Sequence, residues 1–150
     1  MPTERIFTEP DQPSDPARIR LYGMVEHEGY RLYEIPATTP VSDVVIYFRV
    51  GSHGAIQDGT DSDELVRKVA AVTDRLAGII PVGPFFADAA GLKLRFLRRV
   101  SDVDFSRISA LFPEDDICSL GLERYIAEWD GESPILEPII REGFLHLWWD

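Results

Sequence analysis

Apolar and polar positions alternate in two neighbouring stretches near the start of the chain. The first stretch covers residues 18–25 and the second covers residues 30–35, with Gly29 directly before the second. A period of two is typical of a strand with one buried face, because successive side chains point to opposite sides. Glycine adopts the positive φ that tight hairpin turns require. We therefore predict an antiparallel β-hairpin over residues 18–35.

Two segments with different patterns follow the hairpin. Residues 43–50 read Asp-Val-Val-Ile-Tyr-Phe-Arg-Val, a β-branched and aromatic run without alternation, which predicts a strand buried on both faces. Farther along, Asp61 and Glu64 have the spacing of a capping box, and apolar residues then recur at helical spacing as far as Ile79. The pattern predicts a long helix that starts at Asp61 and stops near Gly78.

The middle of the chain then becomes irregular before it alternates again. Residues 80–90 contain prolines and glycines around Phe85 and Phe86, which favours a loop that crosses the sheet. An apolar loop of this kind could serve in recognition, but such loops more often bury their phenylalanines. Residues 92–96 alternate, which predicts a strand with one solvated face.

The last third of the chain contains three predicted elements. Asp102 and Asp104 precede a short apolar-patterned segment that Pro113 ends, which predicts a short helix. Residues 120–129 favour a second short helix, because their apolar side chains share one face. Residues 144–149 alternate and are aromatic, which predicts a final strand.

Together these elements predict an α+β fold. We expect one domain over residues 18–150, with a mixed, mostly antiparallel sheet of about five strands. One long helix and two short helices would pack on that sheet. Residues 1–17 carry four prolines among acidic and small residues, so we expect them to form a flexible Pro-rich tail.

Composition and charge limit the classes of partner. The chain has 150 residues and a formal net charge of −11, so its field repels phosphate backbones and anionic lipid headgroups. Residues 44–48 form the longest apolar stretch, far short of the ~20 residues that span a bilayer. We therefore expect neither a nucleic acid nor a membrane as partner.

Cysteine usage bears on the compartment. The one cysteine, Cys118, cannot form an internal disulfide, and the polar N-terminus has no signal-peptide pattern. These features predict a cytoplasmic protein. The nearby acidic residues 114–116 would raise the pKa of the Cys118 thiol, so we expect a structural thiol rather than a nucleophile.

The segment 51–64 is the main candidate for catalytic chemistry. It joins a predicted buried strand to a helix N-terminus, where an anion can bind, but it lacks the P-loop and dinucleotide motifs. His53 and the nearby carboxylates, including Asp58 and Asp61, could instead hold a hard cation. Acidic residues at a helix start also occur without any metal. We therefore predict a plain capped connection, with a metal-dependent or acid-base enzyme as the alternative.

No other segment has a catalytic motif. His146 lies between apolar residues in the predicted final strand, so we expect a packed or surface histidine rather than a catalytic base. The three histidines and the one cysteine lack the spacing of a zinc site. We predict no catalytic residue, no metal ligand and no cofactor.

Negative charge is concentrated in the last third of the chain. Residues 1–100 hold 14 acidic and 12 basic residues, whereas residues 101–150 hold 12 acidic residues and three arginines. Carboxylates interleaved with aromatic residues suit a basic protein partner, although a charged run is usually only a solvated face. The predicted partner-binding residues are Asp115, Asp116, Glu123, Tyr125, Glu128, Trp129 and Asp130.

The leading functional hypothesis is a small acidic protein-binding module. It would be an inhibitor or immunity-type protein that occludes the active site of a basic enzyme, such as a nuclease or another toxin. A structural or assembly subunit is a further alternative. Such a subunit could use the apolar loop 79–86, or it could pair with another copy through the Trp-rich final strand.

Overall fold

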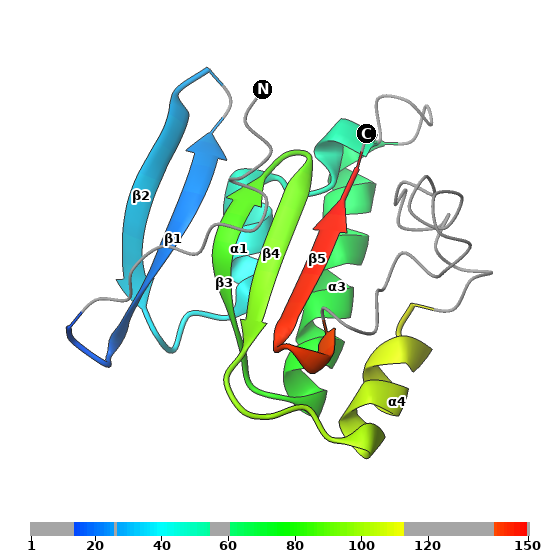
Figure 1. Cartoon of the computed structure of the whole chain (residues 1–150). Coiled ribbons are helices and arrows are strands. Elements are labelled where there is room, and N and C mark those ends of the chain that lie inside the picture. Colours follow the sequence, from blue (N-terminus) through cyan, green and yellow to red (C-terminus); the bar gives the residue numbers. More distant parts are fainter. Residues whose placement is uncertain (1–13, 26, 55–60, 113–139, 150) are drawn as a thin grey trace.

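The computed structural model describes residues 14–25, 27–54, 61–112 and 140–149. They form an α+β domain with a five-stranded sheet in the order β2-β1-β3-β4-β5 (Figure 1). The strands are β1 (Arg18–Val25), β2 (Gly29–Pro36), β3 (Val82–Asp88), β4 (Gly91–Phe96) and β5 (Phe144–Trp148). Only β1 and β3 pair in parallel, and the other neighbouring strands are antiparallel. The fold class predicted from the sequence is therefore confirmed.

The predicted hairpin is present as β1 and β2. The two strands pair from Arg18 opposite Pro36 to Val25 opposite Gly29. The backbone N–H of Glu28 donates to the carbonyl of Val25 at 2.9 Å, and Gly29 has a φ of +82°. Glycine adopts this left-handed conformation at little steric cost, so the turn follows directly from the sequence.

The predicted strand over residues 43–50 is wrong, because the segment forms the helix α1 (Val41–Phe48). Its buried residues Val41, Val44, Val45 and Phe48 have helical spacing. Two further apolar residues of α1, Ile46 and Tyr47, are exposed, and they hide this period in the sequence. Packing of one helical face against the sheet therefore overrides the β-propensity of the valines.

The predicted long helix is confirmed as α3 (Ser62–Ile79). Asp61 is the N-cap residue, and its side chain accepts a hydrogen bond from the backbone N–H of Asp63 at 2.9 Å. Gly78 lies inside the helix rather than at its C-cap, which is Ile80 in an extended conformation. The helix therefore ends one residue later than the glycine suggested.

The predicted loop over residues 80–90 is also wrong, because it contains the central strand β3. Pro84 lacks an N–H, and a register shift occurs between Pro84 and Phe86. The parallel pairing with β1 is confined to Phe86 and Ala87. Proline is tolerated here because the pairing with β1 begins only after it. Phe85 and Phe86 are buried, as expected for this segment, but no apolar loop is formed for recognition.

The strand predicted over residues 92–96 is confirmed as β4, but its second face is not solvated. Lys93 is only 3% exposed. Its Nζ atom lies 4.7 Å from the ring centroid of Phe86 on β3, a distance that allows a cation–π interaction. The alternation therefore reflects two different environments within the protein rather than core and solvent.

Two of the predicted elements in the last third are confirmed. The short helix is α4 (Asp102–Ala110), and the final strand is β5 at one edge of the sheet. The helix predicted over residues 120–129, the thiol Cys118 and the tail residues 1–13 lie outside the described residues.

The described helices and the sheet enclose one core. In Figure 1, α1 and α3 lie behind the sheet. Gly23, Ala87, Leu92 and Leu147 are register neighbours across four strands and are buried on this helix-covered face. Gly23 has no side chain where the ring of Phe48 from α1 meets β1. The sheet can therefore approach α1 closely at this point.

Candidate functional site

All seven predicted partner-binding residues lie outside the described residues, in the segment 113–139. The described part of the chain contains 13 basic and 12 acidic residues, a net charge of +1. The whole chain has a net charge of −11. The segment 113–139 alone contains eight acidic residues and one arginine. The excess negative charge is therefore carried by residues other than those of the described fold.

Several acidic residues of the described fold form ion pairs with arginines. Arg49 donates to Asp63 at 2.8 Å and to the Ser62 hydroxyl at 2.9 Å, which ties the end of α1 to the start of α3. Arg141 pairs with Asp102 at 2.5 Å. Such exposed pairs contribute little stability individually. They do, however, balance the local charge.

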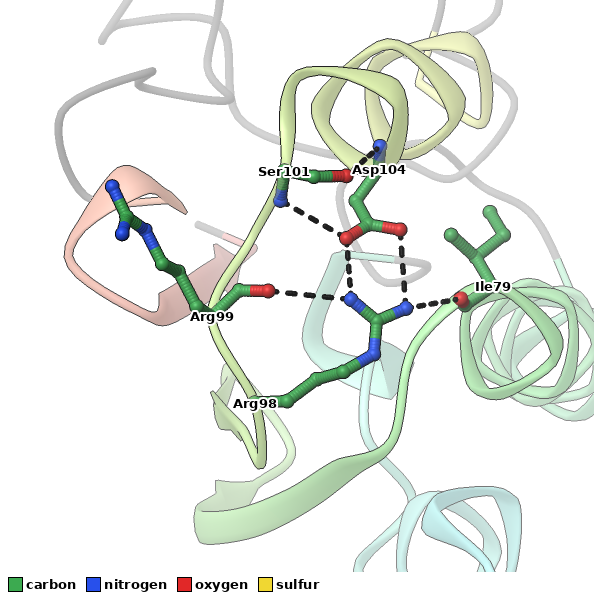
Figure 2. A network of polar contacts seen from close by, with 5 residues as sticks. All are labelled: Ile79, Arg98, Arg99, Ser101 and Asp104. Atoms are coloured by element: carbon green, nitrogen blue, oxygen red, sulfur yellow. Dashed lines mark hydrogen bonds and ion pairs between the residues drawn. The ribbon is translucent and has the colours of Figure 1, made fainter.

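The most connected polar cluster lies where β4 leads into α4 (Figure 2). Arg98 donates to both carboxylate oxygens of Asp104 and also to the backbone carbonyls of Ile79 and Arg99. Asp104 accepts from the backbone N–H of Ser101, whose hydroxyl accepts in turn from the Asp104 N–H. This capping box begins α4, and Arg98 joins it to the Ile79 carbonyl at the end of α3.

These contacts change the acidity of Asp104. The hydrogen bond from Arg98 has the largest effect, the backbone N–H of Ser101 adds to it, and together they hold the pKa of the Asp104 carboxyl well below its usual range. Asp104 is buried and stays ionised, while Arg98 is partly exposed. Because both oxygens of the Asp104 carboxylate are bonded within the fold, the cluster serves to connect α3 to α4.

One row of side chains crosses the whole sheet on the face opposite the buried row. Register neighbours from β2 to β5 are Leu32, Tyr22, Phe86, Lys93 and His146. The row passes from exposed side chains on the hairpin to buried ones on the central strands. Buried aromatic and cationic side chains thus lie beside the exposed side chains of Leu32 and Tyr22.

Two aromatic residues of this face contact ionisable groups. The Tyr30 hydroxyl donates to the Oδ2 atom of Asp88 at 2.8 Å, and the Ala90 N–H donates to Oδ1 at 2.8 Å. The His146 ring lies 4.4 Å from the Trp148 ring, measured between centroids. Of the two states expected for His146, packed or at the surface, this contact favours the packed one.

Burial determines the protonation state of His146. Desolvation is the main cause that lowers its pKa to about 3, and the positive charge of Lys93 adds to the effect. A histidine that stays neutral near pH 7 is a weak base. At neutral pH the ring is therefore unprotonated and has no imidazolium proton to donate as a general acid.

Five of the seven exposed large apolar side chains among the described residues belong to the hairpin and α1. Those of Tyr22, Tyr30, Leu32, Ile46 and Tyr47 are all more than a third exposed. Tyr47 contacts Tyr33 edge to face, with ring centroids 6.4 Å apart. β2 is an edge strand of the described sheet; it carries Tyr30 and Leu32, and Tyr22 on β1 lies opposite Leu32. The sequence alternation predicted the strand but not its position at an edge.

The candidate metal or acid-base site in the segment 51–64 lies only partly within the described residues. His53 and Asp61 lie among the described residues, whereas Asp58 lies outside them. The backbone N–H of His53 donates to the Ala89 carbonyl at 3.1 Å, which places this residue beside the β3–β4 turn. Among the described residues, no group of three or more potential metal ligands comes together. Nor is any described helix long and apolar enough to cross a membrane.

Comparisons with known proteins add no further candidates. No family model matches the chain, and no curated protein or solved structure matches it either.

Proposed function

We propose that this chain is a small acidic protein-binding module that recognises a basic protein. The observation that carries the proposal is the concentration of negative charge in one part of the sequence, since residues 113–139 hold eight acidic residues and one arginine. The described α+β domain has a net charge of +1, whereas the complete chain has a net charge of −11. Opposite charges accelerate association and select partners more than they raise affinity. An excess concentrated in one segment suits this role better than a uniform solubilising surface.

The segment 113–139 contains the residues that would meet this partner. Asp115, Asp116, Glu123, Glu128 and Asp130 supply the attraction, and Tyr125 and Trp129 supply aromatic anchors. Aromatic residues are enriched among the energetically dominant residues of interfaces. The finer proposal is an inhibitor or immunity-type protein that occludes the active site of a basic enzyme such as a nuclease or another toxin. Cytoplasmic localisation belongs to the same proposal, supported by the single Cys118.

The test compares two charge reversals of equal size. The complete chain is used to capture partners from a host lysate at low and high salt, and the association rate of the captured basic protein is then measured. Glu128→Lys with Asp130→Lys should slow association at low salt by about tenfold or more. Asp43→Lys with Asp74→Lys changes the net charge equally on exposed positions of the described fold, and it should have a much smaller effect.

Three results would argue against the proposal. They are equal slowing by both reversal pairs, no salt dependence, and no stoichiometric partner at either salt concentration. Inhibition is then tested by measuring the activity of the captured enzyme with and without the chain. An enzyme that stays fully active in the complex would refute the inhibitor role but not the binding role.

A further inference from the structure

We propose that two copies of this chain pair through their β2 edges, antiparallel and with Leu32 opposite Leu32, to form one continuous sheet. Among the described strands, β2 is the last on its side of the sheet, and Figure 1 shows it on the outer side of the hairpin. An edge strand offers a row of backbone donors and acceptors to another strand. This self-pairing goes beyond the proposed function, because it involves no partner protein.

The hairpin register identifies which backbone groups face outward. The N–H of Ala37 donates to the carbonyl of Ala17 at 2.7 Å, and Arg18 then lies opposite Pro36, which has no N–H. Hydrogen-bonded and non-hydrogen-bonded pairs alternate along an antiparallel ladder. The even-numbered residues of β2 therefore point their N–H and C=O groups away from β1. They are Tyr30, Leu32 and Glu34, and the Glu34 carbonyl accepts only a 3.5 Å contact from Arg18.

The side chains beside this edge favour a protein surface over water. Leu32 is 50% exposed and Tyr30 is 40% exposed, and both lie on one face of β2. On the other face, Tyr33 packs against Tyr47, which is 62% exposed. A second strand at the edge would bury apolar area on both faces of the sheet.

The sequence of β2 is complementary to itself in one register. With Leu32 on the twofold axis, Arg31 lies opposite Tyr33 of the second copy, and Tyr30 lies opposite Glu34. This pairing uses the outward N–H groups of Leu32 and Glu34 and places no like charges opposite each other. Moving the axis to Arg31 would place two arginines face to face. Moving it to Tyr33 would place Pro36, which cannot donate, opposite Tyr30.

Electrostatics do not oppose this contact locally. β2 carries one arginine and one glutamate, and the described fold has a net charge of only +1. A symmetric interface of this kind closes after two copies, because each edge is used once. The other edge strand, β5, was the sequence-based candidate for such pairing. β2 is the better candidate because two of its large apolar side chains, those of Tyr30 and Leu32, are exposed.

The first experiment measures the mass of the purified complete chain by sedimentation equilibrium over a range of concentrations. We expect a concentration-dependent rise from 17.0 kDa towards twice that mass. A chain that stays monomeric up to about 1 mM, where even a weak dimer is populated, would overturn the proposal. The β2 edge would then be open to an extended segment of a partner. The result leaves the test of the proposed function untouched, because no partner is present.

The second experiment tests the register with cysteine variants in a Cys118→Ser background. Leu32→Cys should give a disulfide-linked dimer under mild oxidation, because hydrogen-bonded pairs bring Cα atoms to about 5.5 Å. Glu34→Cys is the matched control, two residues away on the same face and also exposed. It should crosslink at least tenfold less. Equal crosslinking by both variants, or crosslinking by Glu34→Cys alone, would overturn the register.

A third variant tests whether the β2 edge forms the dimer without disturbing the fold. Leu32→Pro removes an outward N–H and leaves the ladder to β1 intact, so it should abolish the dimer while the circular dichroism spectrum stays the same. A folded Leu32→Pro variant that dimerises as strongly as the parent chain would show that the copies meet elsewhere.

Discussion

The guanidinium of Arg98 donates two hydrogen bonds to the carboxylate of Asp104. Nη1 lies 2.5 Å from Oδ2, and Nη2 lies 3.1 Å from Oδ1. The same guanidinium reaches the Ile79 carbonyl at the end of α3 at 3.2 Å. Asp104 also completes the capping box of α4 (Figure 2). One arginine therefore connects two helices that are separated in the sequence by β3 and β4.

The pairing of Asp104 predicts acid sensitivity. Because the folded-state pKa of Asp104 is depressed, its contribution to stability is fully present above the unfolded pKa of about 4 and is lost as the pH falls below it. The parent chain should therefore lose stability more steeply below pH 4 than Asp104→Asn. Urea unfolding at pH 7, 4 and 3 measures this difference. Equal pH slopes in the two proteins would contradict the prediction.

Removing the N-cap of α4 should destabilise the protein at every pH. Ser101→Ala deletes the hydroxyl that accepts from the Asp104 N–H at 3.1 Å, at a cost of about 1 kcal/mol. Ser101→Thr keeps an acceptor and should recover most of the loss. Urea unfolding at pH 7 gives both values. An alanine variant as stable as the parent would mean that the cap contributes nothing.

Burial of His146 predicts a second pH dependence of stability, at higher pH than the one expected for Asp104. The folded protein keeps the imidazole neutral until the pH approaches 3, whereas the unfolded chain binds a proton near pH ~6.5. The free energy of unfolding should therefore decrease as the pH falls from ~6.5, by up to ~1.4 kcal/mol per pH unit. His146→Gln should remove this slope. The control, His27→Asn at an exposed position, should not abolish it.

Lys93 provides an independent check on the environment of His146. Its positive charge is the second cause of the lowered pKa. Lys93→Met should therefore raise the pKa of His146, which an NMR titration of the imidazole resonances measures directly. An unchanged pKa would show that burial alone is responsible.

Close packing at Gly23 predicts that a larger side chain there destabilises the fold and that a smaller side chain at Phe48 reduces this effect. A Cβ atom at position 23 would overlap the ring of Phe48 and lie 3.2 Å from Cε2 of Tyr33. Gly23→Ala should lower the free energy of unfolding by about 1–3 kcal/mol, and adding Phe48→Leu should reduce that penalty in a double-mutant cycle. Gly78→Ala is the control, since nothing lies within 4 Å of its Cβ. It should stabilise α3 by up to ~1 kcal/mol. Equal effects of both substitutions would contradict this account.

Local patterns identified the elements whose signals are contained in a few neighbouring residues. The hairpin needed only alternation and Gly29, and α3 needed only Asp61 and its apolar period. By contrast, α1 was mistaken for a strand because Ile46 and Tyr47 remain exposed. β3 was mistaken for a loop because the tolerance of Pro84 depends on where β1 begins to pair.

The difference between local patterns and contacts of distant segments also applies to the candidate sites. The sequence by itself determined the fold class and the concentration of acidic residues in the last third, because both depend on composition and local order along the chain. Only the tertiary structure decided that β2 lies at an edge, that Lys93 is buried over Phe86, and that Arg98 meets Asp104. Strand order and burial arise from contacts between distant segments, and no local pattern encodes them.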